Sequence, residues 1–353
     1  MSRFLSSKYR SLVEYVPGEQ PRDKKYIKLN TNESPFPPSD GVIRAISKDE
    51  IADLRLYSDP ECKALKAKLA DVYGVKPENL YVANGSDDIL NFAFTAFGDN
   101  GVVYPAISYG FYRVFADLYQ MEAEEIPLQS DFSINAEQYC GKNKLVVIAN
   151  PNAPTGLVLG AEDIEKIVSS NKNSVVLIDE AYIDFGGESC LPLIKKYDNL
   201  LVVRTYSKSR SMAGARLGFA FGSPEIIADL EKLRYSTNPY NVNRLTQAAG
   251  LAALDEDDYY TENCRKIAEN REYTISEMKK LGFSVTDSKA NFIFAKSDKI
   301  SGEDLYLKLK ERGILIRHFS QKEICDYNRI TIGSADEMSM FIKTVAEITE
   351  GIK

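Results

Sequence analysis

The sequence predicts an α/β protein in which a larger domain with a mostly parallel sheet is joined to a smaller α+β domain. Between residues 61 and 234, short runs rich in Val, Ile and Leu alternate with segments whose apolar residues recur at helical spacing. Several runs are apolar throughout, which is typical of strands that are buried on both faces. After about residue 245 a long charged helix precedes a shorter mixture of strands and helices. We therefore expect an N-terminal arm at 1–40 that joins the smaller domain, the larger domain at 41–245 and the smaller domain at 246–353.

The elements follow in order along the chain. The arm ends in Ser34-Pro-Phe-Pro-Pro38, where each proline pushes the preceding residue out of helical geometry. A helix is expected at 61–73, because Leu65, Leu69 and Val72 share one face. The strands expected in the larger domain are 101–104, 144–149, 174–178, 200–203 and 217–221, with helices at 87–97, 111–119, 161–169 and 224–234. The elements expected in the smaller domain are a helix at 257–280, a strand at 291–295, a helix at 302–312, strands at 314–317 and 329–332, and a terminal helix.

The composition argues against several classes of partner and compartment. The net charge is −7 and no basic cluster is present, so nucleic acids and anionic membranes are poor partners. No apolar run is long enough for a membrane-spanning helix, and the first 15 residues lack the apolar stretch of a secretory signal. The five cysteines are scattered without a close pair, which indicates free thiols in a reducing compartment. We therefore expect a cytoplasmic protein.

The sequence contains a single histidine, His318. A zinc site built from several histidines is therefore excluded, and a Ser–His–Asp triad would lack the GxSxG turn that presents its serine. The glycine-rich fingerprints of nicotinamide dehydrogenases and of P-loop proteins are absent as well. We expect no metal, and we expect proton transfer to use a lysine, a tyrosine or a carboxylate.

Polar segments at the ends of apolar runs are the candidates for a site. Asn84-Gly-Ser-Asp-Asp88 leads into an apolar helix whose free N–H groups could bind an anion, although an ordinary capped helix is the alternative. Asp179 ends a buried strand, where open α/β sheets bind ligands, and a buried carboxylate there needs a cation such as a protonated ring nitrogen. Lys208 follows another strand, and Ser207 with Arg216 could clamp a phosphate. Each residue alone also fits a solvated surface group; their common placement at strand ends favours a site.

The stretches around these residues resemble the fold-type I, class II aminotransferases that depend on pyridoxal 5′-phosphate (PLP), and within them the histidinol-phosphate aminotransferase family. The resemblance extends over nearly the whole chain. The matching stretches are Tyr15-Val-Pro-Gly-Glu, Leu29-Asn-Thr-Asn-Glu-Ser-Pro, Tyr57-Ser-Asp-Pro, Asn84-Gly-Ser-Asp, Asn150-Pro-Asn-Ala-Pro-Thr-Gly156, Asp179-Glu-Ala-Tyr182, Thr205-Tyr-Ser-Lys-Ser, Ala213-Gly-Ala-Arg-Leu-Gly218, Pro239-Tyr-Asn-Val-Asn243, Asn291-Phe and Arg329-Ile-Thr-Ile-Gly333. They are more specific for the aminotransferase class than for the substrate, because they mostly bind cofactor and carboxylate.

The resemblance implies an aminotransferase that converts histidinol phosphate and 2-oxoglutarate to imidazole acetol phosphate and glutamate. It implies that Lys208 binds PLP covalently and shuttles a proton, that Asp179 pairs with the pyridinium nitrogen, and that Tyr182 hydrogen-bonds the ring 3′ oxygen. The other implied cofactor-binding residues are Gly85, Ser86, Asp87, Tyr109, Asn152, Thr205, Ser207, Arg216 and, from the other subunit of a homodimer, Tyr57. The implied substrate-binding residues are Tyr15, Asn32, Asn291, Arg317 and Arg329, of which Arg329 would grip the carboxylate of the amino donor.

One departure from the family pattern affects the cofactor. The family usually has an asparagine that contacts the ring 3′ oxygen at the position of Ala153. Either Asn152 takes over this contact, or Tyr182 makes it alone.

The motifs leave other functions open. Relatives keep the cofactor residues and alter the pocket, so the substrate could be another small phosphorylated ketone, derived from a triose or a sugar, or the reaction could be decarboxylation of a phosphorylated amino acid. A PLP-binding regulator without catalytic activity is disfavoured, because Lys208 and Asp179 are both present and no basic DNA-binding segment is visible.

Overall fold

A computed structural model describes residues 2–351 and shows two sheets of different size. The larger sheet has the strand order β2-β8-β7-β6-β5-β3-β4. Strand β8 runs antiparallel to both of its neighbours and the other pairs are parallel, which confirms the mostly parallel sheet expected from the sequence. The strands are β2 (Leu80–Ala83), β3 (Val102–Pro105), β4 (Ala123–Ile126), β5 (Leu145–Ala149), β6 (Val176–Asp179), β7 (Leu200–Thr205) and β8 (Gly218–Phe221).

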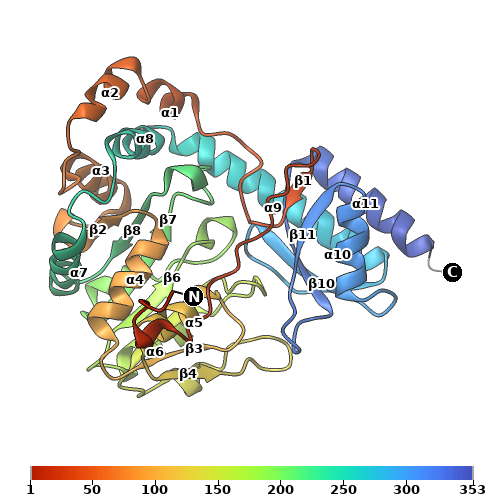
Figure 1. Cartoon of the computed structure of the whole chain (residues 1–353), viewed down its shortest axis with the longest axis horizontal. Coiled ribbons are helices and arrows are strands. Elements are labelled where there is room, and N and C mark those ends of the chain that lie inside the picture. The colour runs from red at the N-terminus through yellow and green to blue at the C-terminus, as the bar shows by residue number, and fades with distance from the viewer. Residues whose placement is uncertain (1, 352–353) are drawn as a thin grey trace.

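Helices cover both faces of the larger sheet, because successive side chains of its strands point to opposite sides and both sides are apolar. In β5, Val146 and Ile148 belong to one buried core, whereas Leu145 and Val147 belong to the other. The first core is completed by α3 (Lys63–Tyr73), α6 (Ala161–Ser170) and α8 (Arg244–Asp255), and the second by α4 (Ser86–Phe97), α5 (Phe111–Leu118) and α7 (Pro224–Thr237). The short helices α1 (Asp40–Ala45) and α2 (Lys48–Ala52) lie against α8 (Figure 1).

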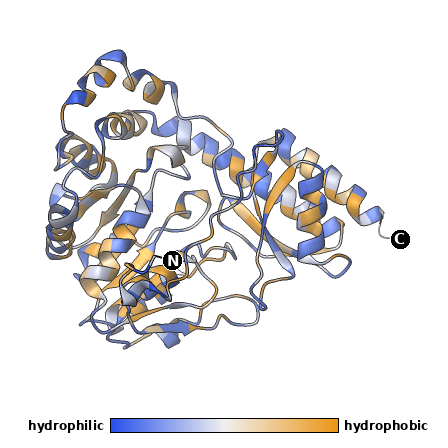
Figure 2. Cartoon of the chain, viewed as in Figure 1, coloured by the Kyte–Doolittle hydropathy of each residue, from blue (hydrophilic) through white to orange (hydrophobic). Residues whose placement is uncertain are grey.

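The smaller sheet has the strand order β1-β11-β12-β10-β9. Its edge strand comes from the arm, because β1 (Ile27–Leu29) pairs in parallel with β11 (Ile314–His318). The other strands are β12 (Tyr327–Thr331), β10 (Phe292–Ser297) and β9 (Phe283–Val285), and the helices that pack with them are α9 (Asp257–Lys280), α10 (Gly302–Glu311) and α11 (Ala335–Glu350). Figure 2 shows largely apolar strands beside helices α10 and α11, along which hydrophobic and hydrophilic residues are mixed.

Helix α9 links the two sheets (Figure 1). Tyr260 near its start packs in a core of the larger sheet, whereas Ile267 and Met278 pack in the core of the smaller one. Its bounds confirm the helix expected at 257–280. Within residues 2–351, no helix combines the length and apolarity that a membrane crossing requires.

Several short elements were not expected from the sequence. Strand β4 is an example: Glu124 and Glu125 interrupt its apolar pattern, because it is an edge strand that is partly exposed to water. Helix α8 begins next to the expected domain boundary at residue 245, yet it packs with the larger sheet. The short 3-10 helices are η1 (Ser7–Tyr9), η2 (Asp53–Arg55), η3 (Pro77–Asn79), η4 (Ala136–Tyr139), η5 (Ile183–Phe185), η6 (Leu191–Lys195) and η7 (Ala213–Ala215).

Candidate active site

Two adjoining cavities lie beyond the carboxyl ends of the parallel strands. The first cavity, of about 400 Å³, is lined by residues that include Ser86, Asp87, Asp179, Thr205, Ser207 and Arg216. The second cavity, of about 320 Å³, is lined by residues that include Tyr15, Asn32, Ala153, Arg317 and Arg329. The residues that line both are Thr31, Tyr109, Tyr182 and Lys208. The structure therefore brings together most of the residues predicted from the sequence.

Asp179 is a buried carboxylate at the end of β6, with only 5% of its surface exposed. Burial raises its pKa to about 6, although hydrogen bonds to the carboxylate oppose this shift. Tyr112 Oη donates to Oδ2 at 3.0 Å, and the backbone N–H of Ala181 donates to Oδ1 at 3.2 Å. Among residues 2–351, no lysine or arginine forms an ion pair with it. A cation in the first cavity would therefore be strongly attracted to Asp179.

Three successive carbonyl oxygens of the arm accept hydrogen bonds from three of the predicted residues. Arg329 Nη2 donates to Asn30 O at 2.9 Å, Lys208 Nζ donates to Thr31 O at 3.3 Å, and Asn291 Nδ2 donates to Asn32 O at 3.1 Å. Lys208 follows β7 of the larger sheet, whereas the other two donors belong to the smaller sheet. The arm thus joins side chains from both sheets at the border of the cavities.

The end of the first cavity near β8 presents several groups that bind anions. Thr205 Oγ1 donates to Ser207 Oγ at 3.0 Å, and Arg216 Nη1 lies 3.5 Å from the same oxygen. Arg216 Nη2 also donates to Asp87 Oδ2 at 3.0 Å. Hydroxyl groups beside a guanidinium are typical ligands of a phosphate.

The start of α4 adds backbone N–H groups to this end. Gly85 has a φ of 87° and immediately precedes Ser86, the first residue of the helix. A Cβ atom at Gly218 would lie 2.5 Å from Gly85 C and Ser86 N, so only glycine permits β8 to approach the helix start. Free N–H groups and the helix dipole both favour an anion at this position.

Tyr109 forms part of the wall between the cavities. Its Oη donates to Asp87 Oδ1 at 2.8 Å, and its ring packs edge-on against Tyr112 with centroids 5.7 Å apart. Burial raises the pKa of Tyr109 well above its usual value, so its hydroxyl keeps its proton.

Two arginines of the second cavity lie directly opposite each other. Arg317 of β11 and Arg329 of β12 are paired residues in the antiparallel ladder. Like charges at such positions repel, and neither arginine forms an ion pair with a carboxylate of residues 2–351. Arg317 instead donates to Val16 O at 3.2 Å and to Pro17 O at 3.3 Å, while Arg329 Nε is buried without a partner in the described chain. The pair would be stabilised by an anion.

Tyr15 covers the second cavity from the arm. Its ring lies 4.3 Å from that of Phe111 and 6.4 Å from that of Tyr109, and burial raises its pKa. The three rings form one aromatic cluster beside the second cavity.

Two predicted cofactor residues lie apart from the cavities of their own chain. Asn152 is buried, and its amide is used within the neighbouring loops: Nδ2 donates to Ile107 O at 3.0 Å and Oδ1 accepts from Ser108 Oγ at 2.8 Å. The expected contact of Asn152 with the cofactor therefore has no support in its position, because its side chain is already bonded elsewhere. Tyr57 is 78% exposed and stacks on Tyr240 with ring centroids 4.5 Å apart.

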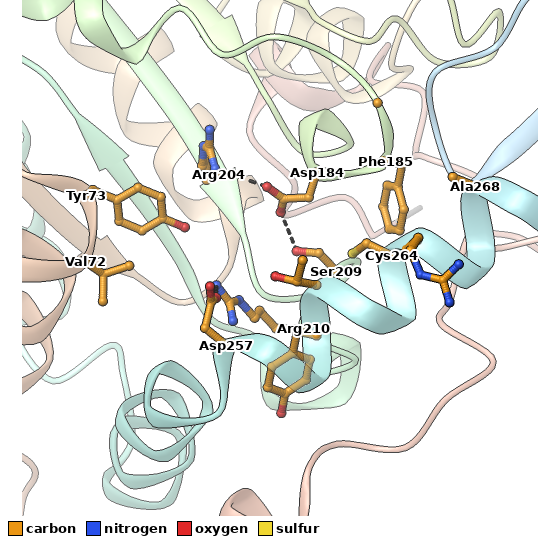
Figure 3. A pocket seen from close by; sticks show the side chains of 14 residues that line it. Val72, Tyr73, Asp184, Phe185, Arg204, Ser209, Arg210, Asp257, Cys264 and Ala268 are labelled. Carbon is orange, nitrogen blue, oxygen red and sulfur yellow. Dashed lines mark hydrogen bonds and ion pairs between the residues drawn. The ribbon is translucent and has the colours of Figure 1, made fainter.

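A third cavity, of about 530 Å³, lies between α3, β7 and α9 and carries an ionic network (Figure 3). Arg204 Nη1 donates to Asp184 Oδ1 at 3.2 Å, and Ser209 Oγ donates to Asp184 Oδ2 at 2.5 Å. Arg204 Nη2 also lies 2.9 Å from Glu180 Oε2. Because Glu180 follows Asp179 and Ser209 follows Lys208, the network fixes the two loops relative to each other. The sequence does not predict this network, although an arginine in the apolar run of β7 is a signal for it.

The chain is similar to known proteins over nearly its whole length. A model of the family "Aminotransferase class I and II" matches residues 24–345. A histidinol-phosphate aminotransferase of Brachyspira hyodysenteriae is 48% identical over 351 residues, which cover 99% of either chain, and one of Clostridium acetobutylicum is 48% identical over 98% of this chain and 99% of the relative. The crystal structure of histidinol-phosphate aminotransferase from Sinorhizobium meliloti in complex with pyridoxal-5′-phosphate has a TM-score of 0.85 and 25% identity, covering 94% of this chain and 93% of that one.

Proposed function

The chain belongs to the class I and II aminotransferases, and from this premise we propose that it exchanges an amino group between histidinol phosphate and 2-oxoglutarate with PLP as its cofactor. The products are imidazole acetol phosphate and glutamate. One observation carries the proposal: an amine, Lys208, and a buried carboxylate, Asp179, line one cavity that also presents anion-binding groups. The names of the similar relatives support the choice of substrate.

The first cavity fits PLP in charge and in hydrogen-bonding groups. The protonated ring nitrogen would supply the cation that Asp179 lacks, and Lys208 would hold the cofactor covalently. Its phosphate would be bound by Thr205, Ser207, Arg216 and the N–H groups at the start of α4. When bound, PLP supplies an electron sink that lowers the barrier to removing the proton from the substrate Cα.

The side chains of the chain itself would perform the remaining tasks. Lys208 would accept the proton that leaves the substrate Cα and shuttle it within the site. Asp179 would keep the ring nitrogen protonated, and Tyr182 would donate a hydrogen bond to the ring 3′ oxygen. Tyr109 would pack on the ring face, and Tyr15 would line the substrate side of the site.

The opposed arginines support an anionic substrate. Arg329 would bind the carboxylate of the amino donor as a two-pronged ion pair, because its Nε lacks a partner in the described chain. Arg317 would bind the second anionic group, which is the side-chain carboxylate of glutamate or the phosphate of histidinol phosphate. One pair of guanidinium groups would then serve both substrates in turn.

The proposal includes a homodimer in which Tyr57 reaches the phosphate of the cofactor in the partner subunit. Tyr57 lies outside the cavities of its own chain and is largely exposed. The segment just before it also carries exposed apolar side chains: Ile43, Ile46, Ile51, Leu54 and Leu56. Such an exposed apolar set is typical of a protein–protein interface. Analytical ultracentrifugation of the purified chain should give a dimer.

A transamination assay tests the substrate. We expect glutamate to form from histidinol phosphate and 2-oxoglutarate, and we expect Lys208→Ala to abolish this activity without changing the fold. A panel of triose and sugar-derived phosphorylated ketones with glutamate serves as the comparison. Faster turnover of one of these ketones, or release of carbon dioxide from a phosphorylated amino acid, would show that the substrate has been assigned wrongly.

A further inference from the structure

Asn32 occupies a conformation that its surroundings hold in place. It has a φ of 55°, in the left-handed region, and only 1% of its surface is exposed. Asn291 Nδ2 donates to its carbonyl oxygen at 3.1 Å, and its own N–H donates to Thr331 Oγ1 at 2.9 Å. Asparagine tolerates this backbone region better than most residues, so the position suits its side chain.

The hydrogen bonds also determine which way the amide of Asn32 points. Thr331 Oγ1 already accepts the N–H of Asn32, so its single proton is free to be donated to Asn32 Oδ1, 3.0 Å away. The oxygen of the amide therefore faces Thr331. The nitrogen faces Tyr182, and Nδ2 donates to Tyr182 Oη at 3.0 Å.

This donor decides the role of the Tyr182 hydroxyl. Because Tyr182 Oη accepts a hydrogen bond from Asn32, the proton on Oη must point away from Asn32. No residue in 2–351 accepts this proton. Tyr182 lines both cavities. The ring of Tyr182 packs edge-on against Phe292 with centroids 5.1 Å apart, which fixes its orientation. The hydroxyl proton of Tyr182 is therefore directed into the space where the two cavities meet.

We propose that Asn32 is a positioning residue that orients the hydroxyl of Tyr182 as a proton donor to the cofactor. The side chain at position 153 is a methyl group in the apolar cluster against which Tyr182 packs, and it offers no hydrogen bond. Asn32 is thus the amide that acts on this hydroxyl, and it acts through Tyr182. The inference rests on the proposed function, because it assumes that PLP occupies the first cavity.

The test is the pH titration of the visible absorbance band of the purified enzyme loaded with PLP. In the loaded enzyme, the nitrogen of Lys208 that is joined to the cofactor shares its proton with the neighbouring 3′ oxygen of the ring. A hydrogen bond donated to this oxygen reduces the oxygen's negative charge and so weakens its hold on the proton. Loss of the donor should therefore raise the midpoint of the titration. For Asn32→Ala we expect a rise of roughly half a pH unit to one unit, the scale of one hydrogen bond.

The double variant separates positioning from a general structural effect. Tyr182→Phe removes the hydroxyl, so adding Asn32→Ala to it should not shift the midpoint further. A second shift of similar size in the double variant, or an unchanged midpoint in Asn32→Ala, would overturn the inference. If wild-type protein forms no visible band that borohydride removes, the proposed cofactor itself is wrong, and the two failures are thereby distinguished.

Thr331→Val provides a second variant in case Asn32→Ala does not fold. It keeps the volume of the side chain and leaves Asn32 in place, but it removes the hydroxyl that orients the amide. We expect a smaller rise of the midpoint, which Tyr182→Phe should again abolish. A midpoint equal to that of wild type in folded Thr331→Val would contradict the inference.

Discussion

Replacement of Asp179 by asparagine should stabilise the cofactor-free protein while it weakens the binding of PLP. In the folded chain the pKa of Asp179 is raised from 3.8 to about 6, chiefly by burial. The folded state therefore holds a proton that the unfolded chain releases, and its stability falls as the pH rises through this window. Asparagine carries no charge, so it avoids this loss at neutral pH.

The magnitude follows from the same shift. A difference of about two pH units corresponds to roughly 3 kcal/mol for one group. Asparagine can still accept from the N–H of Ala181, but it turns the hydroxyl of Tyr112 from a donor into an acceptor, at a cost of about 1 kcal/mol. We expect Asp179→Asn to be more stable than wild type by about 2 kcal/mol at pH 7.5. The advantage should disappear near pH 4, where the folded carboxyl is protonated, the unfolded one is only partly ionised, and the cost of the changed Tyr112 bond offsets the small remaining difference.

Urea denaturation of the two cofactor-free proteins at both pH values measures the effect. Saturating PLP should reverse the order at pH 7.5, because only wild type pairs the ring nitrogen with a carboxylate and gains the full stabilisation of binding. The reasoning is refuted if Asp179→Asn is less stable than cofactor-free wild type at pH 7.5, or if its advantage is the same at pH 4.

Three further predictions concern the other parts of the site. Arg329→Lys should raise the KM for glutamate roughly 10- to 100-fold in steady-state assays with a smaller change in kcat, because lysine cannot form the two-pronged pair; an unchanged KM would exclude Arg329 as the carboxylate ligand. Ser209→Ala removes one hydrogen bond to Asp184 and should lower the free energy of unfolding by about 1–2 kcal/mol, as thermal denaturation would detect. Tyr57→Ala should weaken PLP binding in equilibrium dialysis yet leave the Tyr182-dependent absorbance titration in place; full PLP affinity would argue against a contact with the partner's cofactor.

The sequence predicted the parts of the fold that repeat a simple pattern. The strand expected at 144–149 is apolar from Leu145 onward, and the structure buries both faces of this part as β5. Strand β1 was not expected, because its three residues, Ile27–Leu29, gain their place only from pairing with β11 almost 290 residues later. A local pattern contains no information about such a distant partner.

The site was predictable where a residue contacts the ligand directly and less so where it acts on another residue. Lys208 and Asp179 each stand at the end of an apolar strand, and this placement was visible in the sequence. The bonds of Arg204 to Glu180 and Asp184 depend on how loops fold back across neighbouring strands. The same is true of Asn152, whose amide could not be assigned to the loop around Ile107 without coordinates.

The contacts of the Asn30, Thr31 and Asn32 carbonyls determine when the arm becomes immobilised as the chain is translated. Residues near the start of the chain leave the ribosome first, but the side chain of Arg329, which binds Asn30, emerges about 300 residues later. Until then the stretch lacks part of its contacts, although Lys208, which binds Thr31, and Asn291, which binds Asn32, emerge before Arg329. The first segment to be translated is thus among the last to be immobilised, and a nascent chain that stalls before β12 has a PLP-binding sheet without a finished substrate pocket.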